Sequence, residues 1–143
     1  MDATPTLIDT GPLVSLLSKS QQHHEACVRA FASLPRPLLT CWPVLTEAAY
    51  LLRHRQDLVT SLLQSARGQF LRILPLEEGD LPGINAIRDK YRDQQLDLAD
   101  ACLMQLAERE GVRRVLTLDR DFRRFRTADG EGLELVAVEG AVL

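Results

Sequence analysis

The sequence predicts an α/β fold with a central, mainly parallel sheet of about five strands. Two observations carry this prediction. Short apolar segments, typical of buried strands, alternate along the chain with longer segments whose apolar residues recur at helical spacing. Such alternation requires right-handed crossovers, which make neighbouring strands parallel and place helices on both faces of the sheet. The chain has 143 residues, 45% of them hydrophobic, and we expect residues 1–143 to form a single domain.

Proline residues mark the boundaries of the first elements. An apolar strand near the N-terminus is stopped by Thr-Gly-Pro, and Pro12, which has a fixed φ and no amide donor, suits the first turn of a helix. Pro43 opens a later helix in the same way. The first half of the chain is thus predicted to contain strand 5–9, helices 12–19 and 21–34, strand 38–42, and helices 43–54 and 57–70.

The second half of the chain continues the same alternation. Gly111 follows a long apolar helical segment and is placed to end it. The predicted elements are strand 71–76, helices 81–93 and 96–110, strand 113–119, a short helix at 122–125, and strand 133–138. Asp121 immediately precedes the short helix, and we expect its side chain to cap that helix.

Composition excludes several classes of protein. The cysteines, Cys27, Cys41 and Cys102, are odd in number, lack CxxC spacing and lie in apolar surroundings, which argues against disulfides and a zinc site. There is no apolar run long enough to span a membrane and no signal-peptide pattern at the start. We therefore expect a cytoplasmic protein without a membrane partner.

Basic charge is concentrated although the formal net charge is −3. Such a net charge argues weakly against a nucleic-acid binder. Seven arginines nevertheless crowd into residues 109–126, where lysine is absent. Arginine forks suit phosphates, but they also suit ordinary surface carboxylates, so a phosphate-binding surface and a solvated helix face both remain open.

Two aspartates interrupt the apolar helix predicted at 96–110. At helical spacing Asp97 and Asp100 fall within roughly 60° of each other on one face. Asp97 could cap the helix, with Asp100 completing a capping box. The alternative is a functional pair of carboxylates, which requires further acids placed to meet them.

Further acids are expected at the same place. In parallel α/β sheets, ligands bind at the carboxyl ends of the strands, where the following helices begin. Asp9 is predicted to end the first strand, Asp119 the fourth, and Glu47 lies one turn into the helix after the second. With Asp97 and Asp100 in the first turn of their helix, all five acids are expected to point toward one edge of the sheet.

Converging carboxylates raise one another's pKa unless a cation neutralises them. Mg²⁺ and Mn²⁺ prefer oxygen ligands, and a pair of such ions about 3.5–4 Å apart can clamp the attacking and leaving oxygens of a phosphodiester. The acids therefore predict metal-assisted hydrolysis of a phosphate ester. No GxSxG, P-loop or GxGxxG motif is present, and His23, His24 and His54 are placed for surface roles.

Four motifs in order resemble those of the PIN-domain ribonucleases, in particular the VapC-type toxins of toxin-antitoxin modules. They are LIDTGPLVSLL, LTEAAYLL, DLADACLMQLAE and VLTLDRDF, and together they span nearly the whole chain. The resemblance implies a PIN-like three-layer α/β/α sandwich forming one nuclease domain over residues 1–143. It also implies a catalytic quartet of Asp9, Glu47, Asp100 and Asp119, with Asp97 as an additional metal ligand.

The same resemblance implies an Mg²⁺- or Mn²⁺-dependent endoribonuclease that cleaves single-stranded RNA, forms a homodimer and is inhibited by an antitoxin. The apolar stretches PLVSLL and DLVTSLL, at 12–17 and 57–63, add modest support for self-association. Thr10 and Thr117 adjoin two of the acids, but capping and β-propensity explain them equally well.

Three alternatives stay open from the sequence. One is a PIN nuclease that processes RNA without an antitoxin. Another is a receiver-like or phosphatase-like Mg²⁺-binding domain, although Lys19 and Lys90 are poorly placed for its usual lysine. The third is a non-catalytic protein-interaction module with vestigial acids, which the complete acidic set argues against.

Overall fold

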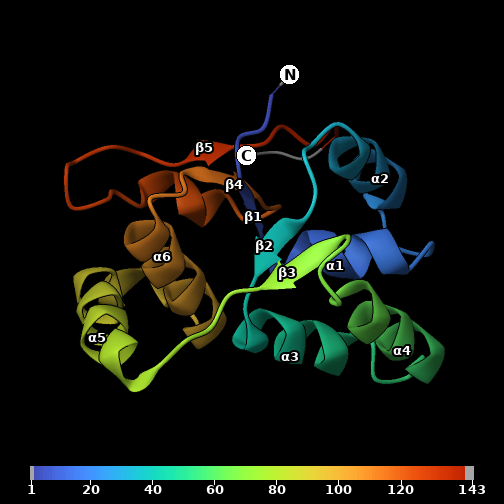
Figure 1. Cartoon of the computed structure of the whole chain (residues 1–143), viewed down its shortest axis with the longest axis horizontal. Coiled ribbons are helices and arrows are strands. Elements are labelled where there is room, and N and C mark those ends of the chain that lie inside the picture. The colour runs from blue at the N-terminus through green and yellow to red at the C-terminus, as the bar shows by residue number, and fades with distance from the viewer. Residues whose placement is uncertain (1, 141–143) are drawn as a thin grey trace.

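A five-stranded parallel sheet lies at the centre of the computed structural model, which describes residues 2–140. The strand order is β3-β2-β1-β4-β5, so the first strand of the chain is also the middle strand of the sheet (Figure 1). This confirms the predicted α/β fold with its parallel sheet. The strands are β1 (Thr6–Ile8), β2 (Leu38–Thr40), β3 (Leu71–Ile73), β4 (Arg114–Leu116) and β5 (Glu134–Leu135).

Helices cover both faces of this sheet, as in a three-layer sandwich. Figure 1 shows α5 and α6 on one side and α1 and α2 on the other. The α-helices are α1 (Thr10–Leu17), α2 (His24–Ala32), α3 (Trp42–Leu51), α4 (Gln56–Ser65), α5 (Leu81–Lys90) and α6 (Leu98–Glu110). Three short 3₁₀ helices complete the described chain: η1 (Glu78–Asp80), η2 (Arg92–Gln94) and η3 (Arg120–Arg124).

The strands are shorter than the apolar segments suggested. β4 pairs with β1 only from Arg114 to Leu116, because β1 gives way to α1 after Ile8. The prediction that Asp119 lies at the end of this strand is therefore wrong by three residues. Helix ends follow local signals more closely, and Gly111, with φ of 66°, ends α6 as expected.

The core is built around β1, β4 and α6. Leu7, Ile8 and Leu116 are fully buried, and most residues of α6, which packs against α5 and α3, are buried as well. The three cysteines are buried and unpaired, as predicted. Between residues 2 and 140, no helix is both long and apolar enough to cross a membrane.

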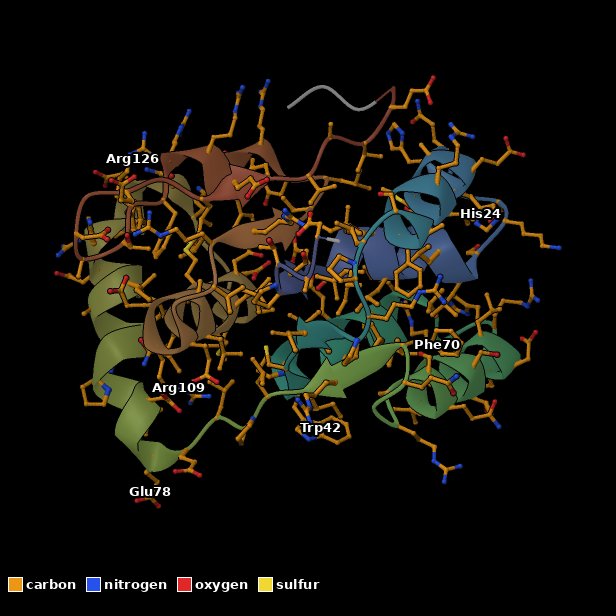
Figure 2. The ribbon with its side chains drawn as sticks, turned by 45° about the horizontal axis from the view of Figure 1, so that its top comes forward. His24, Trp42, Phe70, Glu78, Arg109 and Arg126 are labelled. Carbon is orange, nitrogen blue, oxygen red and sulfur yellow. The ribbon has the colours of Figure 1, made fainter. Side chains whose placement is uncertain are left out.

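The two apolar stretches that supported self-association differ: residues 12–17 are mostly buried, whereas only Leu62 is buried in residues 57–63. Leu13 and Val14 of α1 and Leu62 of α4 are buried, whereas Leu63 is 46% exposed. Self-association therefore stays a prediction, since residues 57–63 leave apolar side chains at the surface although α1 and α4 pack against each other. Large exposed apolar side chains also occur on other helices, and Figure 2 shows Trp42 projecting from the start of α3.

Candidate active site

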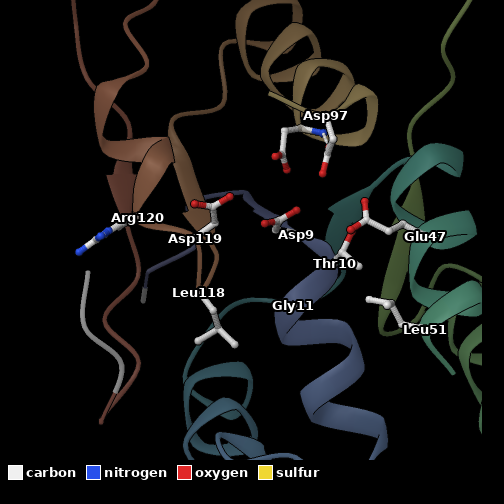
Figure 3. Close-up of a pocket in the computed structure, with 10 residues that line it drawn as sticks. Asp9, Thr10, Gly11, Glu47, Leu51, Asp97, Leu118, Asp119 and Arg120 are labelled. Carbon is white, nitrogen blue, oxygen red and sulfur yellow. Dashed lines mark hydrogen bonds between the residues drawn. The ribbon is translucent and has the colours of Figure 1, made fainter. Parts of the chain in front are cut away.

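All five predicted acids line one cavity at the carboxyl end of the strands. Asp9 follows β1 directly, and Asp97 and Asp100 lie at the start of α6. Asp119 follows β4, and Glu47 lies in the second turn of α3. The cavity has a volume of about 490 Å³, and its remaining lining residues are Thr10, Gly11, Leu51, Leu118 and Arg120 (Figure 3).

Asp9 lies deepest among the sheet-edge acids, with 5% of its surface exposed. Its amide donates to the Leu116 carbonyl oxygen at 3.0 Å, which extends the β1–β4 pairing by one residue. Although Asp9 occupies the N-cap position of α1, its side chain makes no capping bond. Its Oδ1 atom is buried and, among the described residues, has no hydrogen-bond partner. The carboxylate is therefore positioned for something other than helix capping.

The protonation of Asp9 reflects this position. Burial raises the pKa of Asp9 to about 6, and the negative charges of Asp119 and Asp97 act in the same direction. Hydrogen bonds from the Thr10 backbone and the Thr117 side chain act in the opposite direction, since they favour the ionised form.

Asp97 caps α6, whereas Asp100 is a carboxylate of the cavity. Asp97 is the N-cap of α6, and its Oδ1 accepts a hydrogen bond from the Asp100 amide at 2.8 Å. Within residues 2–140, the Asp100 carboxylate returns no such bond and instead lines the cavity, with 8% of the residue exposed. Burial raises the pKa of Asp100 to about 9, helped by the charges of the other four acids.

Asp119 takes the capping role expected of Asp121. The Asp119 Oδ1 atom accepts a hydrogen bond from the Asp121 amide at 2.9 Å, so Asp119 is the N-cap of η3. Asp121 lies inside that helix, and its predicted capping role is wrong. The cause is the early end of β4, which lets the chain turn and begin η3 at Arg120.

Thr117 is a functional candidate that the sequence left undecided. Its fully buried hydroxyl donates to Asp9 Oδ2 at 2.9 Å and accepts from the Asp119 amide at the same distance. One side chain therefore fixes two acids from different segments. The available signal was a hydroxyl residue two positions before an acid, but β-propensity explained it equally well. The Thr10 hydroxyl is also buried without a partner among the described residues.

Glu47 closes the opposite side of the cavity. Figure 3 shows it on α3 above Thr10 and Leu51, across the cavity from Asp119. Burial raises the pKa of Glu47, and the negative charge of Asp97 adds to this effect. The α3 helix does begin at the functional edge of the sheet, as the placement of Glu47 required.

The donor chemistry of the cavity fits a hard divalent cation. All five ionisable donors are carboxylates, which suit Mg²⁺ or Mn²⁺, and a cation would relieve the repulsion that adds to burial in raising the pKa values of Asp9, Glu47 and Asp100. The unpartnered Asp9 Oδ1 offers a ligand atom. As the side chains lie, however, no three of the described His, Cys, Asp or Glu residues are grouped closely enough to hold one metal ion.

Comparison with known proteins decides the family. Residues 6–128 match the family model of the PIN domain. The chain belongs to the PIN-domain family. This PIN domain is 28% identical over 116 residues to ribonuclease VapC26 of Mycobacterium tuberculosis, a match that covers 80% of the chain and 86% of the relative.

Solved structures similar to this PIN domain include the toxin VapC20 of Mycobacterium tuberculosis, which cleaves the sarcin-ricin loop. The TM-score is 0.75 at 18% identity, with 81% of this chain and 91% of VapC20 covered. VapBC2 of Rickettsia felis, bound to a DNA fragment from its promoter, gives 0.60 at 15% identity, covering 92% and 97%. PAE2754 of Pyrobaculum aerophilum gives 0.53 at 18% identity, covering 94% and 92%.

These likenesses agree with the resemblance inferred from the four motifs. At such low identity the solved structures establish a shared fold, and the α/β/α sandwich predicted for this PIN domain is confirmed. The match to the PIN-domain family also argues against the alternative of a receiver-like or phosphatase-like domain.

Proposed function

We propose that this PIN domain is a metal-dependent endoribonuclease that hydrolyses phosphodiester bonds in single-stranded RNA. The observation that carries the proposal is the cavity, which is lined by five carboxylates from four separate segments. One of these carboxylates, Asp9, has a buried oxygen without a hydrogen-bond partner among the described residues. Support also comes from the similarity to VapC26, a ribonuclease, and to VapC20, a toxin that cleaves the sarcin-ricin loop.

Each acid has a role in this proposal. Asp9, Glu47, Asp97, Asp100 and Asp119 would hold Mg²⁺ or Mn²⁺, which when bound neutralises phosphate charge and makes its water a better nucleophile. Asp9, Glu47, Asp100 and Asp119 form the catalytic quartet, and Asp97 adds charge while capping α6. Thr117 is a positioning residue, since it orients Asp9 through the bond to Oδ2.

The proton that the attacking water loses is accepted by one of the same residues. A water molecule attacks phosphorus while one P–O bond of the backbone breaks, and the water must lose a proton as it does so. Glu47 is only half-buried and has a raised pKa, so its carboxylate is suited to accept that proton. Solvent entering the open cavity can protonate the leaving oxygen.

The chain's partners follow from the same proposal. We propose that it acts in the cytoplasm as the toxin of a type II toxin-antitoxin pair and that a small antitoxin inhibits it, as the similarity to VapBC2 supports. An RNA-processing role without an antitoxin is the alternative. A small DNA-binding protein encoded immediately upstream would favour the toxin, and its absence would favour RNA processing.

We also propose that the chain forms a homodimer. The fold leaves large apolar side chains uncovered at the starts of α3, α5 and α6, where Trp42, Leu81 and Leu98 are 58%, 56% and 59% exposed. Sedimentation at micromolar concentration should report a dimer. A monomer in the absence of any partner would contradict this part of the proposal.

An RNA cleavage assay tests the central proposal. The purified chain should cut single-stranded RNA with Mg²⁺ or Mn²⁺ and stop when a chelator is added. Asp100→Asn should reduce the rate severely, whereas Asp93→Asn, an exposed aspartate in η2 outside the cavity, should leave it unchanged. Cleavage that survives exhaustive chelation, or equal rates in both variants, would refute the mechanism.

A further inference from the structure

The seven arginines of residues 109–126 fall into two groups in the structure. Three are held by carboxylates: Arg109 by Asp80 and Glu110, Arg113 by Asp129 and Glu131, and Arg114 by Asp2 and Glu134. Arg126, labelled in Figure 2, folds back to donate to the carbonyl oxygens of Arg123 and Phe125. The remaining three, Arg120, Arg123 and Arg124, have no ion pair or side-chain hydrogen bond to any other residue between 2 and 140.

These three unpartnered arginines, which we call the η3 arginines, share one short helix and are all exposed. In a 3₁₀ helix, residues three apart eclipse each other, so Arg120 and Arg123 are expected on one side of η3, about 6 Å apart along its axis. Successive phosphates on a nucleic-acid strand have a similar separation. The spacing therefore suits two neighbouring phosphates.

The helix that carries them is held firmly against the core. Phe122 lies between the arginines in sequence and is 1% exposed, and Phe125 just beyond the helix is 2% exposed. The Phe125 ring packs on Tyr91 at a centroid distance of 5.8 Å, and the Tyr91 hydroxyl accepts a hydrogen bond from the Arg126 amide at 3.0 Å. A rigid support lowers the entropic cost of presenting the arginine side chains to a ligand.

The η3 arginines begin at the acidic cavity, because the first of them, Arg120, is one of its lining residues. Arg120 follows Asp119 and is the only basic residue among those that line the cavity. Figure 3 shows its side chain on the Asp119 side, directed away from the carboxylates. A phosphate strand entering the cavity meets strong repulsion from the acids, and cations beside the entrance would offset that repulsion over the flanking nucleotides.

We propose that the η3 arginines bind the backbone phosphates of the RNA strand that flank the bond to be cut. This inference rests on the proposed function, because it takes RNA as the substrate. The occupant is RNA rather than an acidic protein because the arginines adjoin the cavity in which the phosphodiester would react. Phosphate contacts of this kind position the strand without reading its sequence.

RNA binding without cleavage tests the inference. A fluorescently labelled, unstructured single-stranded RNA is titrated with the chain in the presence of a chelator, and the Kd is measured over a range of salt concentrations. The triple variant Arg120→Gln, Arg123→Gln, Arg124→Gln should bind about 10- to 100-fold more weakly at about 0.1 M salt. Its log–log salt slope should fall by about 2, or about 0.7 for each lost phosphate contact.

A matched control removes three arginines that carboxylates already hold. The triple variant Arg29→Gln, Arg92→Gln, Arg113→Gln loses the same charge from exposed ion pairs and should bind RNA nearly as the wild type does. Replacing the η3 arginines with lysine should preserve most of the salt slope. Circular dichroism shows whether each variant is folded. If a triple variant does not fold, the individual Arg→Gln variants are measured in its place.

Three outcomes would overturn the inference. They are unchanged RNA binding in the η3 variant, an equal loss of RNA binding in the control variant, and, when labelled polyglutamate is titrated in place of RNA, a loss of binding seen with polyglutamate alone. The last result would assign the surface to an acidic protein. Because binding is measured in chelator, the result is independent of cleavage. A chain that binds RNA through η3 but never cuts it with metal would contradict the proposed function alone.

Discussion

The Thr117 hydroxyl donates a hydrogen bond of 2.9 Å to Asp9 Oδ2, joining residues 108 positions apart in the sequence. The same hydroxyl accepts the Asp119 amide. Asp9 keeps its other carboxylate oxygen unpartnered among the described residues. A single fully buried threonine therefore holds one oxygen of Asp9 and leaves the other free of a partner among the described residues.

Thr117→Val tests this arrangement, because valine keeps the shape and removes the hydroxyl. A buried oxygen of Asp9 and a backbone amide would lose their partner, so the free energy of unfolding should fall by about 1–3 kcal/mol. RNA cleavage should fall as well. Thr117→Ser retains the hydroxyl and should therefore retain most of the stability and most of the cleavage activity. Urea unfolding and cleavage rates measure the two effects, and a fully active Thr117→Val chain would remove Thr117 from the site.

Variants at Asp119 and Asp121 should separate the effect of the carboxylate charge on cleavage from the effect of helix capping on stability. Asp119→Asn keeps an oxygen that can cap η3 but loses the negative charge, so cleavage should be lost while stability is kept. Asp119→Ala should lose about 0.5–2 kcal/mol more stability than Asp119→Asn. Asp121→Ala removes no cap and should change cleavage and stability little. If Asp121→Ala is as inactive as Asp119→Asn, the second aspartate belongs to the site.

The raised carboxyl pKa values predict an unusual pH dependence in the absence of metal. The pKa of Asp100 rises from 3.8 to about 9 and that of Asp9 to about 6, so the folded chain holds protons that the unfolded chain releases. Metal-free stability should therefore fall as pH rises from about 4 to about 9. Asp100→Asn should flatten this dependence, and Asp93→Asn should not. Urea unfolding in the presence of a chelator measures the free energy of unfolding at each pH. An equal change with pH in both variants would contradict the role of Asp100.

Metal binding should reverse that loss of stability. An ion that binds only the folded chain at a concentration of about 100 times its Kd stabilises it by about 2.7 kcal/mol, which corresponds to a rise in Tm of about 5–10 °C. Mn²⁺ should produce such a rise at neutral pH. The rise should be smaller in Asp100→Asn and unchanged in Asp93→Asn. A thermal scan with and without Mn²⁺ makes the measurement, and no response in the wild type would argue against a metal site.

Sequence reasoning located the acids because their placement depends on topology. Alternating strands and helices bring strand ends to one edge, and this holds even where strand boundaries shift by a few residues. The same shift was enough to exchange the capping roles of Asp119 and Asp121, because a cap depends on the residue at which the helix begins. Boundaries are set by pairing partners such as β1 and β4, which local periodicity does not reveal.

The hydrogen-bond and ion-pair partners of side chains could not be predicted from the sequence, for a related reason. Thr117 contacts Asp9 only after two distant strands pair. The arginines of residues 109–126 look equivalent along the chain, yet their carboxylate partners come from segments as distant as Asp2 and Asp80. Their separation into held and unpartnered groups is a property of the folded chain.

The central position of β1 has a consequence for the chain during its own synthesis. β1 is made long before its partner β4, which begins only at Arg114. At about 5–20 residues per second, one edge of β1 therefore waits for seconds without its strand partner, which is a state prone to association with other chains. Asp119 is also missing during that interval. The acidic cavity can therefore be completed only after the ribosome has passed the codon for Asp119.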